Sequence, residues 1–161
     1  MTSQSGAGSI RVREARGDDR GFIDQLGAQT ALATTSPVRP VSNEGAMRAY
    51  RRMAEFCRRR EGTVTLVAER DSQRAGFLML ITDVPDDVTQ LEQGFVAYVA
   101  VAEDQRGQGV GRALIQAAVS ECKRRDIPHV SLMVSSNNAS ARSLYADEAF
   151  VEERILMTKA L

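Results

Sequence analysis

Three glycines at alternate positions form the part of this 161-residue chain best suited to holding a ligand with its backbone. They lie in the stretch QRGQGVGRAL and are Gly107, Gly109 and Gly111, with Arg106 and Arg112 on either side. Glycine allows a ligand to approach closely and takes φ values that other residues avoid. An apolar helical pattern follows at once, and the free N–H groups of a helix start attract anions. The stretch is interpreted as a phosphate-binding loop or, with equal weight, as a flexible glycine-rich turn.

The spacing of the glycines separates three kinds of phosphate loop. A P-loop requires a Gly-Lys pair, which the sequence lacks. A dinucleotide loop requires G-x-G-x-x-G, and its third glycine would fall at Arg112 or Leu114. The pattern R/Q-x-x-G-x-G/A does match from Arg106 to Gly111, between an expected strand and an expected helix. Only this third pattern fits the sequence.

The elements that must position the loop follow from hydrophobic periodicity. Apolar runs predict strands over residues 9–15, 63–69, 75–82, 95–101 and 129–134, with one or two more over 150–159. The short polar link 71–73 predicts an antiparallel hairpin. Apolar stripes predict helices that begin near Asp18 and Asp19, after Ser42, after the glycine loop, and over residues 140–148. Residues 30–41 contain two prolines and are expected to form a loop.

Composition is that of an ordinary globular chain without net charge. Lys and Arg together number 21, as do Asp and Glu, so nothing global favours nucleic acid or an anionic membrane as a partner. No apolar run is long enough to span a bilayer. One domain is expected over residues 9–161, after a disordered leader at 1–8 that is not a signal peptide.

The few cysteines and the single histidine limit the kinds of catalytic site that the chain can form. Cys57 and Cys122 both fall on apolar helix faces, which indicates reduced thiols and a cytoplasmic protein. The single His129 gives no histidine-rich metal set and little scope for a Ser-His-Asp arrangement. The chemistry is therefore expected to depend on other groups.

A second motif follows the glycine loop in residues 137–150, NNASARSLYADEAF. It fits N-x-x-A-x-x-L-Y-x-x-x-G-F through Asn138, Ala141, Leu144, Tyr145 and Phe150. Together the two motifs resemble the GCN5-related N-acetyltransferase (GNAT) superfamily, over about residues 9–159 and most strongly over 95–150. The resemblance implies an α/β (α+β) fold, a single domain with a mixed, mainly antiparallel sheet of about six to seven strands flanked by about four helices. Ala149 departs from the family, which usually has glycine in this helix C-terminal turn, so the turn is open to a different geometry.

The resemblance also implies acetyl-CoA as a co-substrate, without a metal. Main-chain groups of Val99 and Val101 would pair with the pantetheine arm, with the Val101 N–H or a neighbour polarising the thioester carbonyl. Asn138 would bind the pantetheine or only cap the following helix. The pyrophosphate would lie on the glycine loop and the arginines beside it, that is, on Arg106, Gly107, Gln108, Gly109, Val110, Gly111 and Arg112.

For catalysis, Tyr145 matches the family's usual general acid, which gives a proton to the departing thiolate. Its other interpretation is a core aromatic on a short helix. The general base is less defined, because the inner strand positions Phe95, Ala97 and Val99 carry no carboxylate. Glu92, just upstream, is the candidate base acting through water, or simply a solvated loop acid.

The implied activity is transfer of the acetyl group to a primary amine by direct attack in a ternary complex. The acceptor stays open among small-molecule amines, amino acids, antibiotics and protein N-termini. The alternative is a non-catalytic acyl-CoA-binding sensor or interaction module, which the missing strand carboxylate favours and the intact Tyr145 disfavours. Edge strands and a last hairpin could support a homodimer.

Overall fold

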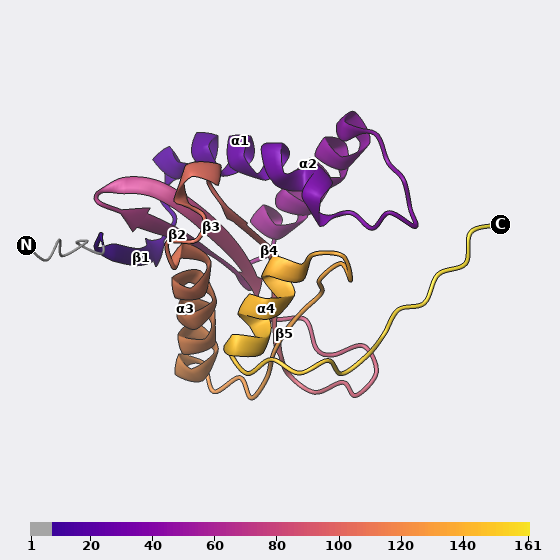
Figure 1. Cartoon of the computed structure of the whole chain (residues 1–161). Helices are drawn as coiled ribbons and strands as arrows, with labels where there is room; N and C mark the ends of the chain where they lie inside the picture. Colours follow the sequence, from indigo (N-terminus) through magenta and orange to yellow (C-terminus); the bar gives the residue numbers. More distant parts are fainter. Residues whose placement is uncertain (1–7) are drawn as a thin grey trace, which may run out of the picture.

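The computed structural model describes residues 8–161 and is built on one twisted sheet (Figure 1). Its five strands lie in the order β1-β2-β3-β4-β5. They are β1 (Ile10–Glu14), β2 (Thr63–Arg70), β3 (Gln73–Ile81), β4 (Gly94–Val101) and β5 (Val130–Leu132). All neighbours are antiparallel except β4 and β5, which are parallel. The expected mixed, mainly antiparallel sheet is confirmed, while residues 1–7 of the expected leader lie outside the described residues.

Helices cover both faces of the sheet. The helices α1 (Arg20–Thr30) and α2 (Asn43–Arg59) pack on one face, and α3 (Val110–Arg124) and α4 (Ala139–Asp147) on the other. The central strand β3 is therefore buried on both sides and is apolar almost throughout, instead of alternating. Its Phe77 faces the cluster formed by α1 and α2, and Leu78 faces the cluster under α3.

Local signals in the sequence place several element boundaries. The Ser42 hydroxyl accepts a hydrogen bond from the Gly45 amide at 3.0 Å and caps α2, as its residue type predicts. The β2–β3 hairpin is confirmed, and it turns through Asp71 and Ser72 with φ of 51° and 66°. Two left-handed residues are what a two-residue hairpin of matching twist requires. A short 3₁₀ helix, Ala31–Thr34, occupies the first part of the loop expected over residues 30–41.

The predicted strands over residues 150–159 are wrong, so the sheet has five strands instead of six or seven. Residues 150–161 pair with none of the five strands, and the apolar side chains Ile155, Leu156 and Met157 stay exposed. Arg154 also holds this segment against the β3–β4 loop through Asp86 at 2.5 Å. The sheet ends at β5, and the C-terminal segment extends away from it (Figure 1).

Within residues 8–161, none of the helices has the length and apolarity needed to cross a membrane.

Candidate active site

The glycine loop opens α3 with a run of unused backbone donors. Gly107 and Gly109 have φ of +71° and +85°, a region that disfavours residues with a Cβ atom. Gly109 is the N-cap of α3 and offers no side chain to its amides, and the first helical bond runs from the Ala113 amide to the Gly109 carbonyl at 3.0 Å. The backbone amides of residues 107–112 have no acceptor among the described residues. Such a run at a helix start is an anion-binding surface.

Gly111 brings three elements together. A Cβ atom on this glycine would lie 3.3 Å from Leu144 Cδ2 and 3.7 Å from Val101 Cγ2. The first turn of α3 therefore touches both the end of β4 and the helix that carries Tyr145. The two motifs, which are separated along the chain, therefore lie side by side in the structure.

Strand β4 has an open edge beside this loop. Its pairing with β5 stops at Val96 opposite Leu132, whereas its pairing with β3 continues to Val101. The register against β3 shifts between Val96 and Tyr98, which leaves Ala97 without an opposite residue. The main chain from Ala97 to Val101 is thus unpaired on the β5 side, and it can receive an extended ligand as an added strand.

The two arginines of the motif are already engaged. The Arg106 Nε donates to the Val101 carbonyl at 3.4 Å. The Arg112 guanidinium binds Asp147 at 2.8 Å and Glu148 at 3.0 Å, and so ties α3 to the end of α4. Phosphate contacts by either side chain stay a prediction and would have to replace these bonds. Gln108 is exposed and Val110 is buried, so Val110 can offer only its amide.

Tyr145 lies on the inner face of α4 with 9% of its surface exposed. Its ring packs at 5.9 Å from the ring of Phe150, and its hydroxyl has no hydrogen-bond partner among the described residues. Among residues 8–161, Thr63 Oγ1 is the only fully enclosed side-chain nitrogen or oxygen without a hydrogen-bond partner. The Tyr145 oxygen also lacks a partner, so it is not fully enclosed. Burial raises the pKa of the phenol, which keeps it protonated near neutral pH.

The two ends of α4 fix the position of Tyr145. The Asn138 side chain accepts from the Ala141 amide at 3.2 Å, so its capping role is realised. At the other end the Ala149 amide donates to the Ala146 carbonyl, and the Phe150 amide to that of Tyr145. This is the hydrogen-bond pattern of a Schellman turn, and Ala149 takes φ of 63° to complete it. The turn thus keeps the geometry that glycine usually provides.

The inner positions of β4, Phe95, Ala97 and Val99, carry no carboxylate. Glu92 is an exposed residue of the loop before β4, without a hydrogen bond or ion pair among the described residues. Its role as a base through water stays a prediction. The described part of the chain also holds no group of His, Cys, Asp or Glu side chains placed to bind a metal ion.

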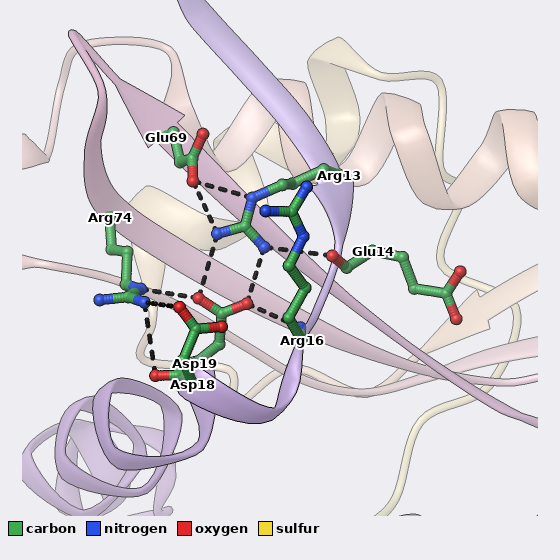
Figure 2. A network of polar contacts seen from close by, with 7 residues as sticks. All are labelled: Arg13, Glu14, Arg16, Asp18, Asp19, Glu69 and Arg74. Atoms are coloured by element: carbon green, nitrogen blue, oxygen red, sulfur yellow. Dashed lines mark hydrogen bonds and ion pairs between the residues drawn. The ribbon is translucent and has the colours of Figure 1, made fainter.

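Sequence reasoning missed a polar cluster at the other face of the sheet (Figure 2). Asp18 and Asp19 were expected to supply the cap of the first helix, and Asp19 does so in the 3₁₀ turn Gly17–Asp19 that leads into α1. Its carboxylate is also fully buried and accepts from Arg13 at 2.7 Å and from Arg74 at 2.6 Å. The Arg16 amide donates to it at 2.7 Å. These donors, Arg13 first, hold the pKa of Asp19 well below its usual range. Only the pairing of β1, β2 and β3 brings Arg13 and Arg74 to this carboxylate, so no local pattern could indicate it.

A model of the acetyltransferase (GNAT) family matches residues 29–150. The chain belongs to this family. It is 33% identical over 93 residues to the L-2,4-diaminobutyric acid acetyltransferase of Nocardia farcinica, covering 56% of this chain and 45% of that protein. It is 34% identical over 65 residues to the ribosomal protein bS18 alanine N-acetyltransferase of Escherichia coli K12, covering 40% of this chain and 44% of that protein. The chain therefore matches less than half the length of these relatives.

Solved structures share the fold over almost the whole chain. The ribosomal-protein-alanine N-acetyltransferase of Brucella melitensis superimposes with a TM-score of 0.67, at 22% identity, over 95% of this chain and 99% of that one. The crystal structure of a transcriptional regulator from Bacillus halodurans superimposes with a TM-score of 0.71, at 18% identity, over 95% of this chain and 100% of that one. Proteins with this fold therefore carry names that describe different activities, and the function must be argued from the site.

Proposed function

We propose that this GNAT protein is an N-acetyltransferase that moves the acetyl group of acetyl-CoA to a primary amine. The donor-rich loop supports this proposal, because residues 107–112 present successive free amides where a diphosphate would lie. The open edge of β4 beside the loop gives the pantetheine arm a strand to pair with. Bound there, acetyl-CoA supplies an activated acyl group as a thioester.

The chemistry proposed for the chain's own groups is an acyl transfer without a covalent enzyme intermediate. The amine nitrogen forms a bond to the thioester carbon, and the carbon–sulfur bond breaks. A main-chain N–H of β4 near Val101 stabilises the developing oxyanion. Tyr145 donates its proton to the departing thiolate, and the proton lost by the amine passes to water, with Glu92 as the candidate relay.

The observation that carries the proposal is the state of Tyr145. Its hydroxyl has no hydrogen-bond partner in the described part of the chain, its pKa is raised by burial, and its helix touches the glycine loop through Leu144 and Gly111. A structural tyrosine in a core normally finds a partner for its hydroxyl. Tyr50 in α2 shows this contrast, since its hydroxyl donates to the Ile23 carbonyl at 2.9 Å.

Calorimetric titration with acetyl-CoA, followed by thiol-release assays with a panel of amines, tests the proposal. We expect Tyr145→Phe to keep the affinity for acetyl-CoA and to lower kcat about 100-fold, the size of a general-acid contribution. Tyr50→Phe is the matched control, and it should leave kcat of the folded protein unchanged.

Two other outcomes would contradict the proposal in different ways. Binding of acetyl-CoA without turnover of any amine would favour the non-catalytic sensor. Absence of binding would mean that residues 105–114 form only a glycine-rich turn.

A further inference from the structure

The exposed side of α2 concentrates positive charge. From Asn43 to the C-cap Arg60 the segment contains six arginines against two glutamates, a local charge of +4 in a chain whose formal net charge is zero. The rest of the chain consequently carries −4, so the two signs are segregated on the molecule. We call these arginines the arginine face, and they are Arg48, Arg51, Arg52, Arg58, Arg59 and Arg60.

Helical spacing gathers much of this charge on one stripe. Arg48, Arg52 and Arg59 recur at i, i+4 and i+11, which places them on the same side of an α-helix. At the usual helical rise, the stripe from Arg48 to Arg59 is about 16 Å long. The opposite side of α2 is buried in the core through Tyr50 and Ala54, so the stripe faces solvent.

The middle of the stripe holds guanidinium groups without partners. Arg51 and Arg52 are exposed, and neither makes a hydrogen bond or an ion pair within residues 8–161. The side chain of Arg48 is 61% exposed and approaches Glu44 only to 3.8 Å. These groups are therefore available to an anion that approaches from solvent.

Phe56 adds an aromatic ring to the stripe. It is 50% exposed, and the Arg60 guanidinium lies 5.1 Å from the centre of its ring. Arg59 donates through Nε to Glu55 at 2.8 Å, and its terminal nitrogens have no partner in the described part of the chain. An open hollow of about 610 Å³ is lined by Arg51, Arg52, Glu55, Phe56, Arg59 and Arg60. An exposed ring among cations is a surface on which a planar group can stack.

Three classes of anionic partner carry enough charge to match this face: a membrane surface, an acidic protein and nucleic acid. A membrane-bound helix inserts its apolar side, but that side of α2 is buried against the sheet through Ala46, Ala54 and Cys57. A protein interface has an apolar centre, whereas Phe56 is the one exposed large apolar side chain of α2. Interfaces with nucleic acid are polar and strongly positive, and arginine binds phosphate through two parallel hydrogen bonds.

The exposed ring favours a single strand, because the bases of a duplex are stacked on one another and only an unpaired base can lie on Phe56. We propose that the arginine face binds single-stranded nucleic acid, with a base stacked on Phe56 and phosphates bound by Arg48, Arg51, Arg52 and Arg59. Contacts to phosphates and to the face of a base carry no sequence information, so the binding is general.

The arginine face is separate from the glycine loop. The helix α2 covers one face of the sheet, whereas α3, which begins at the loop, covers the other (Figure 1). Nucleic acid and acetyl-CoA therefore have different sites, and binding at the arginine face does not depend on the proposed function.

Fluorescence anisotropy with a labelled oligouridylate of 12 nucleotides and the full-length protein measures this binding. We expect a Kd of about 1–100 μM at 150 mM salt, the range of sequence-independent binding. The affinity should fall roughly 20- to 50-fold between 50 and 200 mM salt, as for three or four phosphate contacts to a single strand. An abasic oligomer of the same length keeps the charge without the bases, and it should bind about fivefold more weakly or worse.

A charge variant and a matched control locate the phosphate contacts. Arg51→Gln combined with Arg52→Gln should lower the affinity about tenfold or more at 50 mM salt, and should reduce the slope of log affinity against log salt by about 1.4. Arg11→Gln combined with Lys123→Gln removes two exposed positive charges elsewhere and should change the affinity less than twofold. Both variants should bind acetyl-CoA as the natural chain does.

Substitutions of Phe56 test the stacking separately from the charge. Phe56→Ala should lower the affinity about fivefold or more without changing the salt slope, because it removes the ring and no cation. Phe56→Trp keeps a ring and should retain the affinity. Thermal unfolding confirms that both variants are folded.

Four results would overturn the inference, and each is distinguishable from the others. Absence of binding at 50 mM salt would mean that α2 presents only a solvated charged surface. Tighter binding of a polyglutamate peptide would make the face an interface for an acidic protein, and tighter binding to phosphatidylglycerol vesicles would make it a membrane contact. Equal losses in the charge variant and its control would mean that the oligomer senses total charge and not the arginine face.

Discussion

The Asp19 cluster and the glycine loop are both polar, but the hydrogen-bonding groups of the first have partners and the backbone donors of the second do not. Around Asp19, each carboxylate oxygen has a donor from Arg13, Arg16 or Arg74. In residues 107–112 none of the backbone amides has an acceptor among the described residues. A satisfied buried network stabilises one arrangement of the chain, whereas unsatisfied donors at the surface are available to a ligand. The first region therefore stabilises the fold, and the second has donors that a ligand could use.

Removal of the Asp19 carboxylate should produce the largest effect on stability. We expect Asp19→Ala to lower the free energy of unfolding by about 3–5 kcal/mol, because it leaves Arg13 and Arg74 without their shared partner. Urea unfolding measures this change. The neighbouring Asp18 is exposed and also pairs with Arg74, so Asp18→Ala should cost at most about 1 kcal/mol. Equal effects of the two substitutions would show that the cluster does not stabilise the fold as a buried network.

A side chain added to the glycine loop should change ligand affinity more than it changes stability. We expect Gly109→Ala to cost about 1–2 kcal/mol of stability, because φ of +85° is strained for alanine. Its affinity for acetyl-CoA should fall at least tenfold as the loop relaxes from its donor arrangement. Gly21 in α1 has open space around its Cα, so Gly21→Ala should stabilise the helix by about 0.5–1 kcal/mol and leave affinity unchanged. Unchanged affinity in Gly109→Ala would separate the loop from ligand binding.

Acid should weaken the Asp19 cluster. The folded-state pKa of Asp19 lies below its value of about 3.9 in an unfolded chain, so its contribution is complete above that value and is lost as pH falls toward the folded pKa. We expect this group alone to remove about 1 kcal/mol of stability between pH 5 and pH 3. Urea midpoints across this range, compared with those of Asp19→Asn, measure the contribution. A variant with the same acid dependence as the natural chain would contradict it.

Relief of strain at Ala149 should give the smallest effect, and one of opposite sign. We expect Ala149→Gly to stabilise the protein by about 0.5–1 kcal/mol, because glycine takes φ of 63° without a Cβ clash. This net gain allows for the greater conformational entropy that glycine has in the unfolded chain. Thermal unfolding measures the gain. Because the Schellman turn would be kept, Tyr145 should stay in place and kcat should not change. A loss of stability would mean that the alanine methyl group contributes packing that the turn geometry does not reveal.

Local patterns in the sequence were sufficient to predict most of the helices and strands and to find both motifs. The alternating apolar residues of β2, the Ser42 cap and the stripe of α3 depend on neighbours within a few positions, and the structure confirms them. The strands expected after residue 150 failed because a strand needs a partner edge as well as apolar residues. The ion pairs of Arg154 with Asp86 and Asp87 direct that segment elsewhere, and they join residues 67 and 68 positions apart.

The sequence by itself determined the family, the glycine loop and the helix that carries Tyr145, because these depend on backbone φ, capping and residue spacing within short stretches. Only the tertiary structure decided which polar groups are satisfied and which are free. It joined Asp19 to Arg74, 55 residues away, and Arg112 to Asp147, 35 residues away. Among residues 8–161, it left the hydroxyl of Tyr145 without a hydrogen-bond partner. Partners of this kind come from strand order and helix packing, and these arise only when distant segments bury their apolar faces together.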